Sequence, residues 1–392
     1  MNEGTPQQPS AIISPESIPE ATVEIDGSIL EGGGQVLRNT CALAAILGKR
    51  IHIVKIRGGR QKGGLKAQHM TGIQLVSELC GGSLEGATIG STEITLEPRT
   101  LRGGAFKADT QTAGAITLLL QAALPVMLFA PTACHAVLKG GSNVSMSPQI
   151  DYIQLVLAPT LLRFGVHFEL RLERRGFFPR GGGVVVVDTE PHGTLSPIDL
   201  TAQGEAMQQA VDSATRRAYQ LLGPQVQVQI DKVPVGPDRA FGHGWGMVLY
   251  ASTSTGCIIA GDALGEGKMT AERAGAQAIE NISADLRAGA CLDQYAQDQV
   301  IIYMALARGR SRIRTGPLTL HTQTALHFAH LLTGWRQQRQ LQPRQGRDSP
   351  SLGRDEPLLA LEGDPKPELD QAMYDINGDG WSWVTERRFA IK

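Results

Sequence analysis

One histidine stands where nucleophilic chemistry is often found. His321 lies between a short alternating apolar stretch, 317–320, and a helix-like stretch, 322–329. This pattern predicts a strand that runs into a helix. The amino terminus of a helix attracts phosphate, and it keeps a neighbouring imidazole neutral and therefore nucleophilic. A histidine that only caps the helix or packs in the core fits the same local pattern, and most histidines do no chemistry.

Two blocks of three glycines provide a second indication. Glu31 comes directly before glycines 32–34, and Arg38 lies one turn into the helix that is predicted to follow. Backbone amides at such a junction can approach a phosphate, and a carboxylate beside them suits a metal–nucleotide contact. A structural turn explains these glycines equally well. The second block, 181–183, precedes a predicted strand, and a simple bend is its alternative explanation. Neither block continues into Gly-Lys-Ser/Thr, so the chain has no P-loop.

A third group of residues has helical spacing. Tyr295, Asp298 and Gln299 stand at positions i, i+3 and i+4 of a helix predicted over 292–305, so they share one face. A ring, an acid and an amide could together hold a nucleobase and its ribose. An ordinary solvated helix face is the alternative. The segment 49–66 adds seven Lys or Arg residues and no acid, which fits either a solvated basic loop or an anion site.

The elements that would position these residues recur along the chain. A helix-like segment, a turn and a β-rich segment follow one another several times, which predicts an α+β assembly in which helices cover sheets. The predicted helices cover 35–47, 68–80, 114–124 and 148–164, and the predicted strands cover 51–56, 93–96 and 166–170. The apolar run 115–130 is too short to span a bilayer and contains Gln121 and Pro125, so we interpret it as a core element.

Length favours more than one domain, because 392 residues exceed one ordinary core. The composition changes after the strand at 184–187. We predict an inserted domain with a helix near 205–222, strands at 226–230 and 247–251, and a helix over 270–286. The predicted organisation is a disordered leader at 1–20, a main domain at 21–193 and 291–335, an inserted small α/β domain at 194–290, and a linker or tail at 336–392 with a closing strand in 381–392.

Composition narrows the class of protein. The net charge of −1 and pI of about 6.8 give no global basic surface, and 46 glycines with only 5% aromatic residues indicate many tight loops around a ligand. Five widely spaced cysteines predict reduced thiols in an intracellular protein, and the amino terminus does not have the pattern of a signal peptide.

One motif stands apart from the others. Asp375, Asn377, Asp379, Gly380 and Glu386 match the ligand positions of an EF-hand loop. The segment has no partner hand, and its Asn-Gly-Asp-Gly sequence also suits a hairpin turn, which we favour over calcium binding.

Taken together, the motifs closely resemble the RNA 3'-terminal phosphate cyclase family over residues 22–333. The matching blocks are Glu31-Gly-Gly-Gly-Gln-x-Leu-Arg38, Arg57 to Arg60, Gln68-His69, Gly140-Gly-Ser-Asn143, Pro148-Gln-Ile-Asp-Tyr152, Arg175-Gly-x-x-Pro-x-Gly-Gly-Gly183, Asp298-Gln299 and His321-Thr-Gln-Thr-Ala. The blocks at 175–183 and 321–325 are the most specific ones.

The resemblance implies a fold and a reaction. The fold is a series of units, each a four-stranded sheet with two helices as in enolpyruvyl transferase domains, with an inserted α/β domain. In the reaction, ATP adenylates a histidine, AMP passes to an RNA 3'-phosphate, and the neighbouring 2'-hydroxyl displaces AMP to give a 2',3'-cyclic phosphate. The expected partners are therefore ATP, Mg²⁺ or Mn²⁺ and RNA with a 3'-phosphate end. A nuclear location follows if the chain is eukaryotic, and a cytoplasmic one otherwise.

The resemblance also assigns residues to roles. His321 is the expected nucleophile and Glu31 the expected metal ligand. The ATP pocket is expected to include Gln121, Pro148, Tyr295, Asp298 and Gln299. Phosphate or RNA is expected to be bound by Arg38, Arg57, Arg60, Gln68 and His69.

Two other functions stay open at this point. A non-catalytic relative that acts in ribosomal RNA processing would lack the nucleophilic histidine, whereas His321 is present here. An enolpyruvyl transferase of similar fold is disfavoured by the 175–183 block. The chain departs from the family between Leu200 and Met207, where an expected strand and turn are missing, and after Gly334, where the tail resembles no familiar terminus.

Overall fold

The computed structural model describes residues 21–203, 206–207, 234–236, 238–265, 267, 269–334, 336–342, 356–362, 381–382 and 390–391. The predicted leader and the predicted strand 226–230 lie outside the described residues. The same is true of nearly all of the predicted helix 205–222, and of all but two residues of the EF-hand-like segment 375–386.

The first structural unit has the order strand, helix, strand, helix, strand, strand. The first two strands are parallel, and the last strand inserts antiparallel between the second and the third, giving the sheet order β1-β2-β4-β3. In β2, Ile51 and Ile53 are buried while His52 and Val54 are only partly so, which is the alternation of a half-buried strand. The elements are β1 (Val23–Asp26), α1 (Gly34–Leu47), β2 (Ile51–Val54), α2 (Ala67–Leu79), β3 (Ser83–Glu85) and β4 (Ile94–Glu97).

The second unit repeats this topology. Its sheet has the order β5-β6-β8-β7, again with the first two strands parallel and the fourth between the second and third. A short strand from later in the chain, β11 (Ala240–Phe241), extends the sheet beside β7. The elements are β5 (Gly104–Asp109), α3 (Ile116–Leu128), β6 (Cys134–Gly140), the continuous helical run α4 (Ile150–Tyr152), η1 (Ile153–Leu157) and α5 (Ala158–Leu162), then β7 (Phe168–Gly176) and β8 (Gly183–Thr189).

The third unit has the same topology, although its members are far apart in the sequence. The sheet order is β9-β14-β16-β15, with β9 parallel to β14 and β16 antiparallel to both of its neighbours. The elements are β9 (Asp199–Leu200), α8 (Ala296–Gln299), α9 (Ile301–Leu306), β14 (Ser311–Arg314), α10 (Leu320–Thr333), β15 (Arg336–Gln342) and β16 (Glu356–Glu362).

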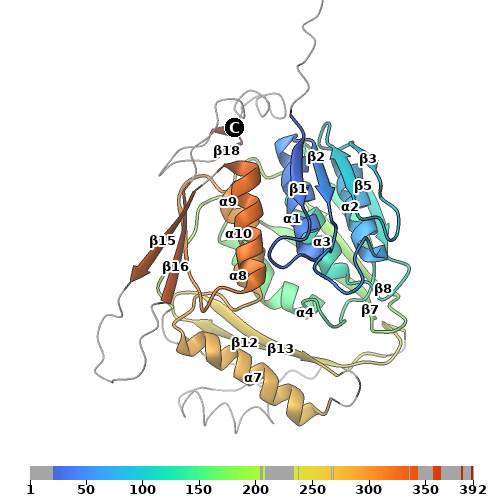
Figure 1. Cartoon of the computed structure of the whole chain (residues 1–392). Helices are drawn as coiled ribbons and strands as arrows, with labels where there is room; N and C mark the ends of the chain where they lie inside the picture. Colours follow the sequence, from blue (N-terminus) through green and yellow to red (C-terminus); the bar gives the residue numbers. More distant parts are fainter. Residues whose placement is uncertain are drawn as a thin grey trace, which may run out of the picture.

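Between β9 and α8 the chain forms a separate small α/β layer. Helix α7 lies along the sheet β10-β12-β13, below the other units in Figure 1. Its elements are β10 (Ala206–Met207), β12 (Gly246–Thr253), β13 (Ile258–Leu264) and α7 (Ala271–Arg287). Leu249, Ile259, Ala278, Ile279 and Ile282 form a small core of their own here, apart from the main core that the three repeated units share. The α+β class predicted from the sequence is confirmed.

Three local predictions differ from the structure. No strand forms at 317–320, because Thr319 caps α10 with its hydroxyl and the preceding strand is β14. The helix predicted over 292–305 is divided into α8 and α9, with Val300 at the junction.

The third difference concerns the tail. The sequence pattern gave a linker over 336–368 and a closing strand in 381–392, whereas residues 336–342 and 356–362 form the two strands that complete the third sheet. The strands β17 (Trp381–Ser382) and β18 (Ala390–Ile391) pair with each other. Polar composition hid β15, an edge strand with a single leucine, and the apolar β16 lies inside a segment whose flanks are rich in Gln, Arg, Pro, Asp and Gly. The domain boundaries themselves stay predictions.

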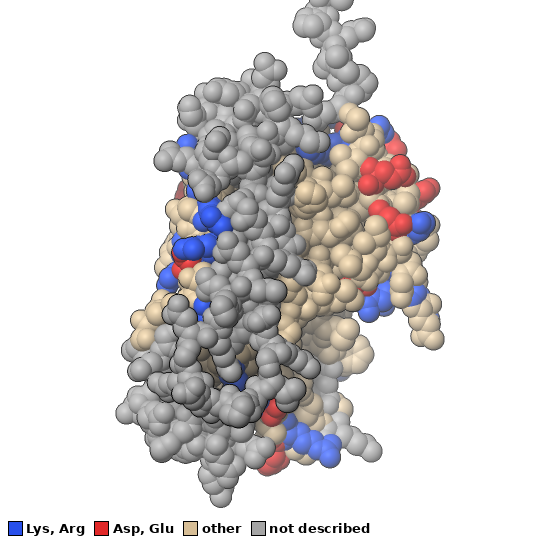
Figure 2. Space-filling model, turned by 60° about the vertical axis from the view of Figure 1, so that its left-hand side comes forward, with Lys and Arg blue, Asp and Glu red and all other residues tan. Residues whose placement is uncertain are grey.

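Two surface properties follow from this architecture. On the face drawn in Figure 2, basic and acidic side chains both occur, and neither sign covers the visible described surface. Among the described helices, none is long and apolar enough to cross a membrane.

Close packing of α7 on β13 depends on one glycine. A Cβ at Gly261 would collide with the carbonyl oxygen of Ala278 in α7, whereas a Cβ at Gly193 meets nothing within 4 Å. We expect Gly261→Ala to lower the free energy of unfolding by about 1–3 kcal/mol, because α7 must move away from the sheet. Gly193→Ala is the matched control and should change it little. Chemical denaturation of both variants measures the difference, and equal stabilities would contradict the described packing.

Candidate active site

The first turn of α10 places His321 at the second helical position. Thr319 caps the helix by accepting a hydrogen bond from the Thr322 amide at 3.0 Å. Gln297 of α8 fixes this start, because its side-chain oxygen accepts hydrogen bonds from the Thr319 amide and the Thr322 hydroxyl, at 3.1 and 2.6 Å. The imidazole of His321 is therefore held at a well-defined helix end, with the positive end of the helix dipole beside it.

A chain of hydrogen bonds connects His321 with two distant segments. The Gln35 side chain, in the first turn of α1, donates from Nε2 to Asp298 Oδ2 at 2.7 Å. Its Oε1 lies 3.0 Å from Nδ1 of His321. When Asp298 is ionised, the bond to its carboxylate fixes which end of the amide faces the histidine, so the amide oxygen accepts and His321 Nδ1 carries the proton. Nε2 of His321 is then left with an unprotonated lone pair.

The electrostatic surroundings keep His321 neutral. Burial lowers its pKa, and the positive charges of Arg38 and Arg60 lower the pKa further. A neutral imidazole with a free Nε2 is the nucleophilic form of histidine, so the geometry and the charges act in the same direction.

Arg38 and Asp298 form the charged centre behind this imidazole. Arg38 donates from Nε to Oε1 of Gln121, on α3, at 3.0 Å. Burial lowers the pKa of Arg38 to about 10, and the nearby carboxylate of Asp298 opposes that shift. Burial raises the pKa of Asp298 to about 7, against the attraction of Arg38. Removal from water thus outweighs the mutual attraction for both groups.

A narrow cleft opens next to this centre, between α1, α3, η1 and the α8–α9 segment. The polar groups of Gln121, Asp298 and Gln299 face an otherwise apolar wall. The Gln299 side chain donates to the backbone oxygen of Tyr295 at 2.6 Å, while its buried Oε1 has no partner in the described part of the chain. The slot measures about 20 Å³, and its amide and carboxylate groups beside apolar side chains are of the chemical kind that binds a nucleobase. The other residues that line it are Asn39, Thr117, Leu120, Leu124, Ile153, Leu157, Ile302 and Tyr303.

Pro148 and Tyr295 lie at the border of this cleft. The Thr117 hydroxyl, which lines the cleft, donates to the Pro148 carbonyl at 2.8 Å. The side chain of Tyr295 does not line the cleft; its hydroxyl meets Asn281 of α7 at 3.3 Å, and its ring packs edge-on against Tyr152 with centroids 6.0 Å apart. The shared helix face predicted for Tyr295, Asp298 and Gln299 therefore delivers two of its three side chains to the cleft.

A fully buried carboxylate sets the position of α8. Asp293 accepts hydrogen bonds from the Tyr152 hydroxyl and from the amides of Ala260, Tyr295 and Ala296, at 2.7 to 2.9 Å. Burial raises its pKa to about 6, while these bonds lower it. Because Ala260 belongs to β13, Asp293 also ties the inserted layer to the helix that carries Asp298.

Glu31 faces the same site from the turn before α1. Its amide donates to the Thr324 hydroxyl of α10 at 3.1 Å. Its carboxylate pairs with Arg60, and its Oε2 is buried without a hydrogen-bond partner among the described residues. An unsatisfied carboxylate oxygen is costly unless a ligand completes it, so this atom fits a divalent cation. No cluster of three or more His, Cys, Asp or Glu side chains occurs in the described residues.

Arg57 is used differently from Arg60. Its guanidinium donates to the carbonyls of Lys62 and Gly64, at 2.8 and 3.0 Å, and its φ of +54° is unusual for a residue with a Cβ. These bonds hold the basic loop in shape. The predicted direct contact between Arg57 and phosphate stays a prediction.

Gln68 and His69 support the glycine turns that surround the site. Gln68 accepts from the Ala115 amide at 3.2 Å, and His69 Nδ1 accepts from the Lys66 amide at 3.2 Å. Burial lowers the pKa of His69 to about 3, with further lowering by Arg38, Arg57 and Lys66. A Cβ at Gly34 would approach the His69 ring to 2.5 Å, which explains why a glycine begins α1.

Sequence reasoning gave Gln35 no role, although it lies in the Glu31–Arg38 block. Gln297 and Thr324 were also absent from the expected site. Gln35 and Thr324 act through contacts with residues more than 250 positions away, and Gln297 through contacts 22 and 25 positions away. The blocks at 31–38 and 321–325 offered a signal for Gln35 and Thr324, and no motif offered one for Gln297.

Comparison with known proteins identifies the family of this chain. The family model for RNA 3'-terminal phosphate cyclase matches residues 29–338. The chain belongs to the RNA 3'-terminal phosphate cyclase family.

Individual relatives share much of the chain. The RNA 3'-terminal phosphate cyclase of Pyrobaculum neutrophilum is 41% identical over 321 residues, which cover 78% of this chain and 91% of the relative. The protein of the same name from Drosophila melanogaster is 38% identical and covers 80% of this chain and 92% of its own. A probable cyclase of Dictyostelium discoideum is 40% identical over 79% of this chain and 76% of its own. Among solved structures, EPSP synthase from Acinetobacter baumannii aligns with a TM-score of 0.26 at 11% identity, over 87% of this chain and 64% of its own, too weak a likeness to carry an argument.

The raised pKa of Asp298 has a consequence for stability. Between the ordinary value of 3.8 and the folded value of about 7, the folded chain binds more protons at this residue than the unfolded chain, so its contribution to stability falls as the pH rises through that window. In Asp298→Asn this contribution is absent. We expect the variant to gain about 3–4 kcal/mol relative to the wild type between pH 4 and pH 7.5, because each unit of pKa shift corresponds to about 1.4 kcal/mol, measured by denaturant unfolding at each pH. A constant difference across this range would contradict the burial of an ionisable group there.

Proposed function

We propose that this chain converts an RNA 3'-terminal phosphate to a 2',3'-cyclic phosphate with ATP, through a covalent adenylate on Nε2 of His321. The observation that carries the proposal is the hydrogen-bond chain from Asp298 through Gln35 to Nδ1 of His321. It leaves Nε2 as the atom with a lone pair. Family membership supports the overall reaction and the use of ATP.

The proposed reaction has three displacements at phosphorus. Nε2 of His321 attacks the α-phosphorus of ATP, a P–N bond forms, and pyrophosphate leaves. An oxygen of the RNA 3'-phosphate then attacks the same phosphorus, the P–N bond breaks, and AMP is joined to the RNA end. Finally the adjacent 2'-hydroxyl attacks the terminal phosphorus of the RNA, loses its proton, and releases AMP. Adenylation converts a poor leaving group into a good one, which is why ATP is required.

Each group of residues at the site would have its own role in this reaction. The apolar cleft with Gln121, Asp298 and Gln299 would hold the adenine and ribose, and Arg38 and Arg60 would neutralise phosphate charge. Glu31 would hold Mg²⁺ or Mn²⁺, which when bound supplies charge neutralisation on the triphosphate. His321 faces these groups from the end of α10, where the helix dipole favours an incoming phosphate.

A non-catalytic role in ribosomal RNA processing is the alternative function. A protein of that kind needs no nucleophile, whereas here a neutral histidine is oriented by a buried glutamine and an acid. We therefore favour the ligase-type enzyme. We further propose an intracellular location, nuclear in a eukaryote; the five cysteines are all free and buried, which suits a reducing compartment.

Covalent labelling tests the nucleophile. With ATP labelled in the α-phosphate and a divalent metal, the wild type should acquire label that acid removes and alkali does not, as expected of a phosphoramidate. His321→Ala should acquire none, a loss of at least about 1000-fold, since no other group takes its place. His327→Ala, on the exposed face of the same helix, is the matched control and should label normally. Undiminished label in His321→Ala would overturn the mechanism.

Replacing Gln35 tests the orientation of the histidine. Gln35→Met keeps the volume of the side chain but removes both hydrogen bonds, so Nδ1 and Nε2 of His321 compete for the proton. We expect the rate of adenylate formation to fall about 100-fold, as for other catalytic histidines that lose their orienting partner. Gln154→Met, at an exposed glutamine, should leave the rate unchanged. A wild-type rate in Gln35→Met would show that the hydrogen-bond chain has no part in the reaction.

A further inference from the structure

The exposed aromatic side chains of the described chain gather in one place. Phe178, Phe241 and Trp245 are 67%, 43% and 38% exposed. Within the described parts of 21–203 and 234–334, every other Phe, Tyr or Trp is buried or half-buried. Exposed aromatic rings that cluster together are typical of a binding surface.

These rings belong to two loops that meet at a cleft of about 220 Å³. One loop is the glycine block after β7, which carries Phe177 and Phe178, and the other is the segment 241–246, which carries His243 and Trp245. Asn143 forms the floor of the cleft between them. Phe241 lies beside it, at the end of β11.

Backbone contacts fix the two loops to each other before any ligand arrives. β11 pairs with the end of β7, with Ala240 opposite Arg175, and the Arg175 amide donates to the Arg239 carbonyl at 2.8 Å. The Trp245 carbonyl accepts from the Gly265 amide of the inserted layer at 2.9 Å. Rings that are held in place lose little conformational entropy when a ligand binds.

Glycines let these rings lie directly on the backbone. A Cβ at Gly182 would collide with the ring of Phe241, and a Cβ at Gly265 would collide with the ring of Trp245. The guanidinium of Arg174 donates to the Gly182 carbonyl at 2.9 Å and stands 5.2 Å from the centre of the Phe241 ring. The specific glycine block at 175–183 therefore builds a platform for aromatic side chains.

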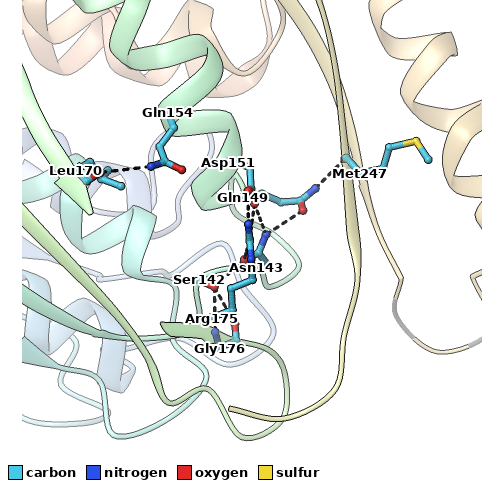
Figure 3. Close-up of polar contacts among 9 residues, drawn as sticks. All are labelled: Ser142, Asn143, Gln149, Asp151, Gln154, Leu170, Arg175, Gly176 and Met247. Atoms are coloured by element: carbon cyan, nitrogen blue, oxygen red, sulfur yellow. Dashed lines mark hydrogen bonds and ion pairs between the residues drawn. The ribbon is translucent and has the colours of Figure 1, made fainter. Parts of the chain in front are cut away.

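The hydrogen-bond network below the cleft connects it with the inserted layer. Arg175 pairs with both oxygens of Asp151, at 2.6 and 2.7 Å, and also donates to Asn143. Gln149 accepts from Asn143 and donates to the Met247 carbonyl at 3.1 Å, so it reaches across to the strand β12 (Figure 3). These contacts neutralise the Asp151 carboxylate and hold the floor of the cleft rigid.

Charge at the rim of the cleft favours an anionic ligand. Arg180, Arg239 and His243 are exposed on the same two loops. Asp238 is the exposed acid of the 238–246 loop, and the carboxylates of Asp151 and Asp262 are engaged by Arg175 and Gln149. Aromatic rings together with arginines are the combination that binds single-stranded nucleic acid, because bases stack on the rings while the cations meet the phosphates.

The glycine block that carries Phe178 packs on a loop that leads toward the candidate active site. Gly181 packs so closely on the loop 112–113 that a Cβ there would collide with the Thr112 carbonyl. The same loop continues to Ala115, whose amide donates a hydrogen bond to the Gln68 side chain. His69 follows Gln68 in the sequence, and its ring lies against Gly34 at the start of α1. The loop 112–115 thus contacts both the glycine block and Gln68 of the first unit.

We propose that the aromatic cleft, lined by Phe178, His243 and Trp245 and flanked by Phe241, Arg180 and Arg239, binds the single-stranded nucleotides that precede the RNA 3' end. This rests on the proposed function, which makes an RNA end the substrate. The cleft selects unpaired nucleotides, because a ring can stack on a base only when that base has left its own helix.

Single replacements of the rings test the proposal in the full chain. Phe178→Ala, Phe241→Ala and Trp245→Ala should each weaken binding of a 3'-phosphorylated decaribonucleotide about tenfold, measured by fluorescence anisotropy. Phe241→Leu keeps the apolar bulk, so a similar loss there identifies stacking and not folding as the cause. Leu162→Ala is the matched control, because Leu162 is 58% exposed on α5, away from the cleft.

A second measurement separates this proposal from the reaction itself. Adenylate formation on His321 without RNA should be unchanged in the ring variants, since the rings do not line the nucleotide cleft. Wild-type affinity for the decaribonucleotide in all three ring variants, or equal loss in Leu162→Ala, would overturn the aromatic cleft as an RNA site. A wild-type protein that binds RNA through the rings but forms no adenylate would instead contradict the proposed reaction.

Discussion

The arrangement of the site depends on one buried amide. Gln35 is 2% exposed and joins the first turn of α1 to Asp298 on one side and to His321 on the other. The amide nitrogen donates and the amide oxygen accepts, so a carboxylate bound to the nitrogen leaves the oxygen to accept a hydrogen bond from His321. A single hydrogen-bond acceptor thereby selects the histidine tautomer, and the positions of α1, α8 and α10 must agree with one another for the selection to work.

The repeated units hold these three helices in the required positions. Each unit returns its chain through a helix between parallel strands, and in Figure 1 helices α1, α3 and α10 lie next to each other. Residues from the first turns of α1 and α10 meet there, which brings together the positive ends of two helix dipoles and the side chains of Arg38 and Arg60. The same convergence explains the pKa shifts: burial raises that of Asp298, and burial with positive charge lowers that of His321.

Polar contacts also connect the inserted layer to the helices that carry the site. Asp293 receives an amide of β13 as well as two amides at the start of α8, and Gln149 contacts both β12 and the loop that carries Asn143. Two independent polar connections therefore fix the layer to the units that carry the nucleotide cleft. They also help to hold the 241–246 loop against the glycine block of the second unit. The surface proposed for a ligand needs both segments, because neither one forms it alone.

Local residue patterns in the sequence determined most of the first two units, because apolar periodicity and glycine turns are properties of short segments. They also predicted His321, Glu31 and the Asp298–Gln299 pair as candidates through compact motifs. Tertiary structure alone decided that Gln35 meets both Asp298 and His321, and that the strands at 336–342 and 356–362 complete the third sheet. The physical reason is the same in each case: a hydrogen bond or a strand pairing depends on which distant segment arrives beside it, and no short pattern records that partner.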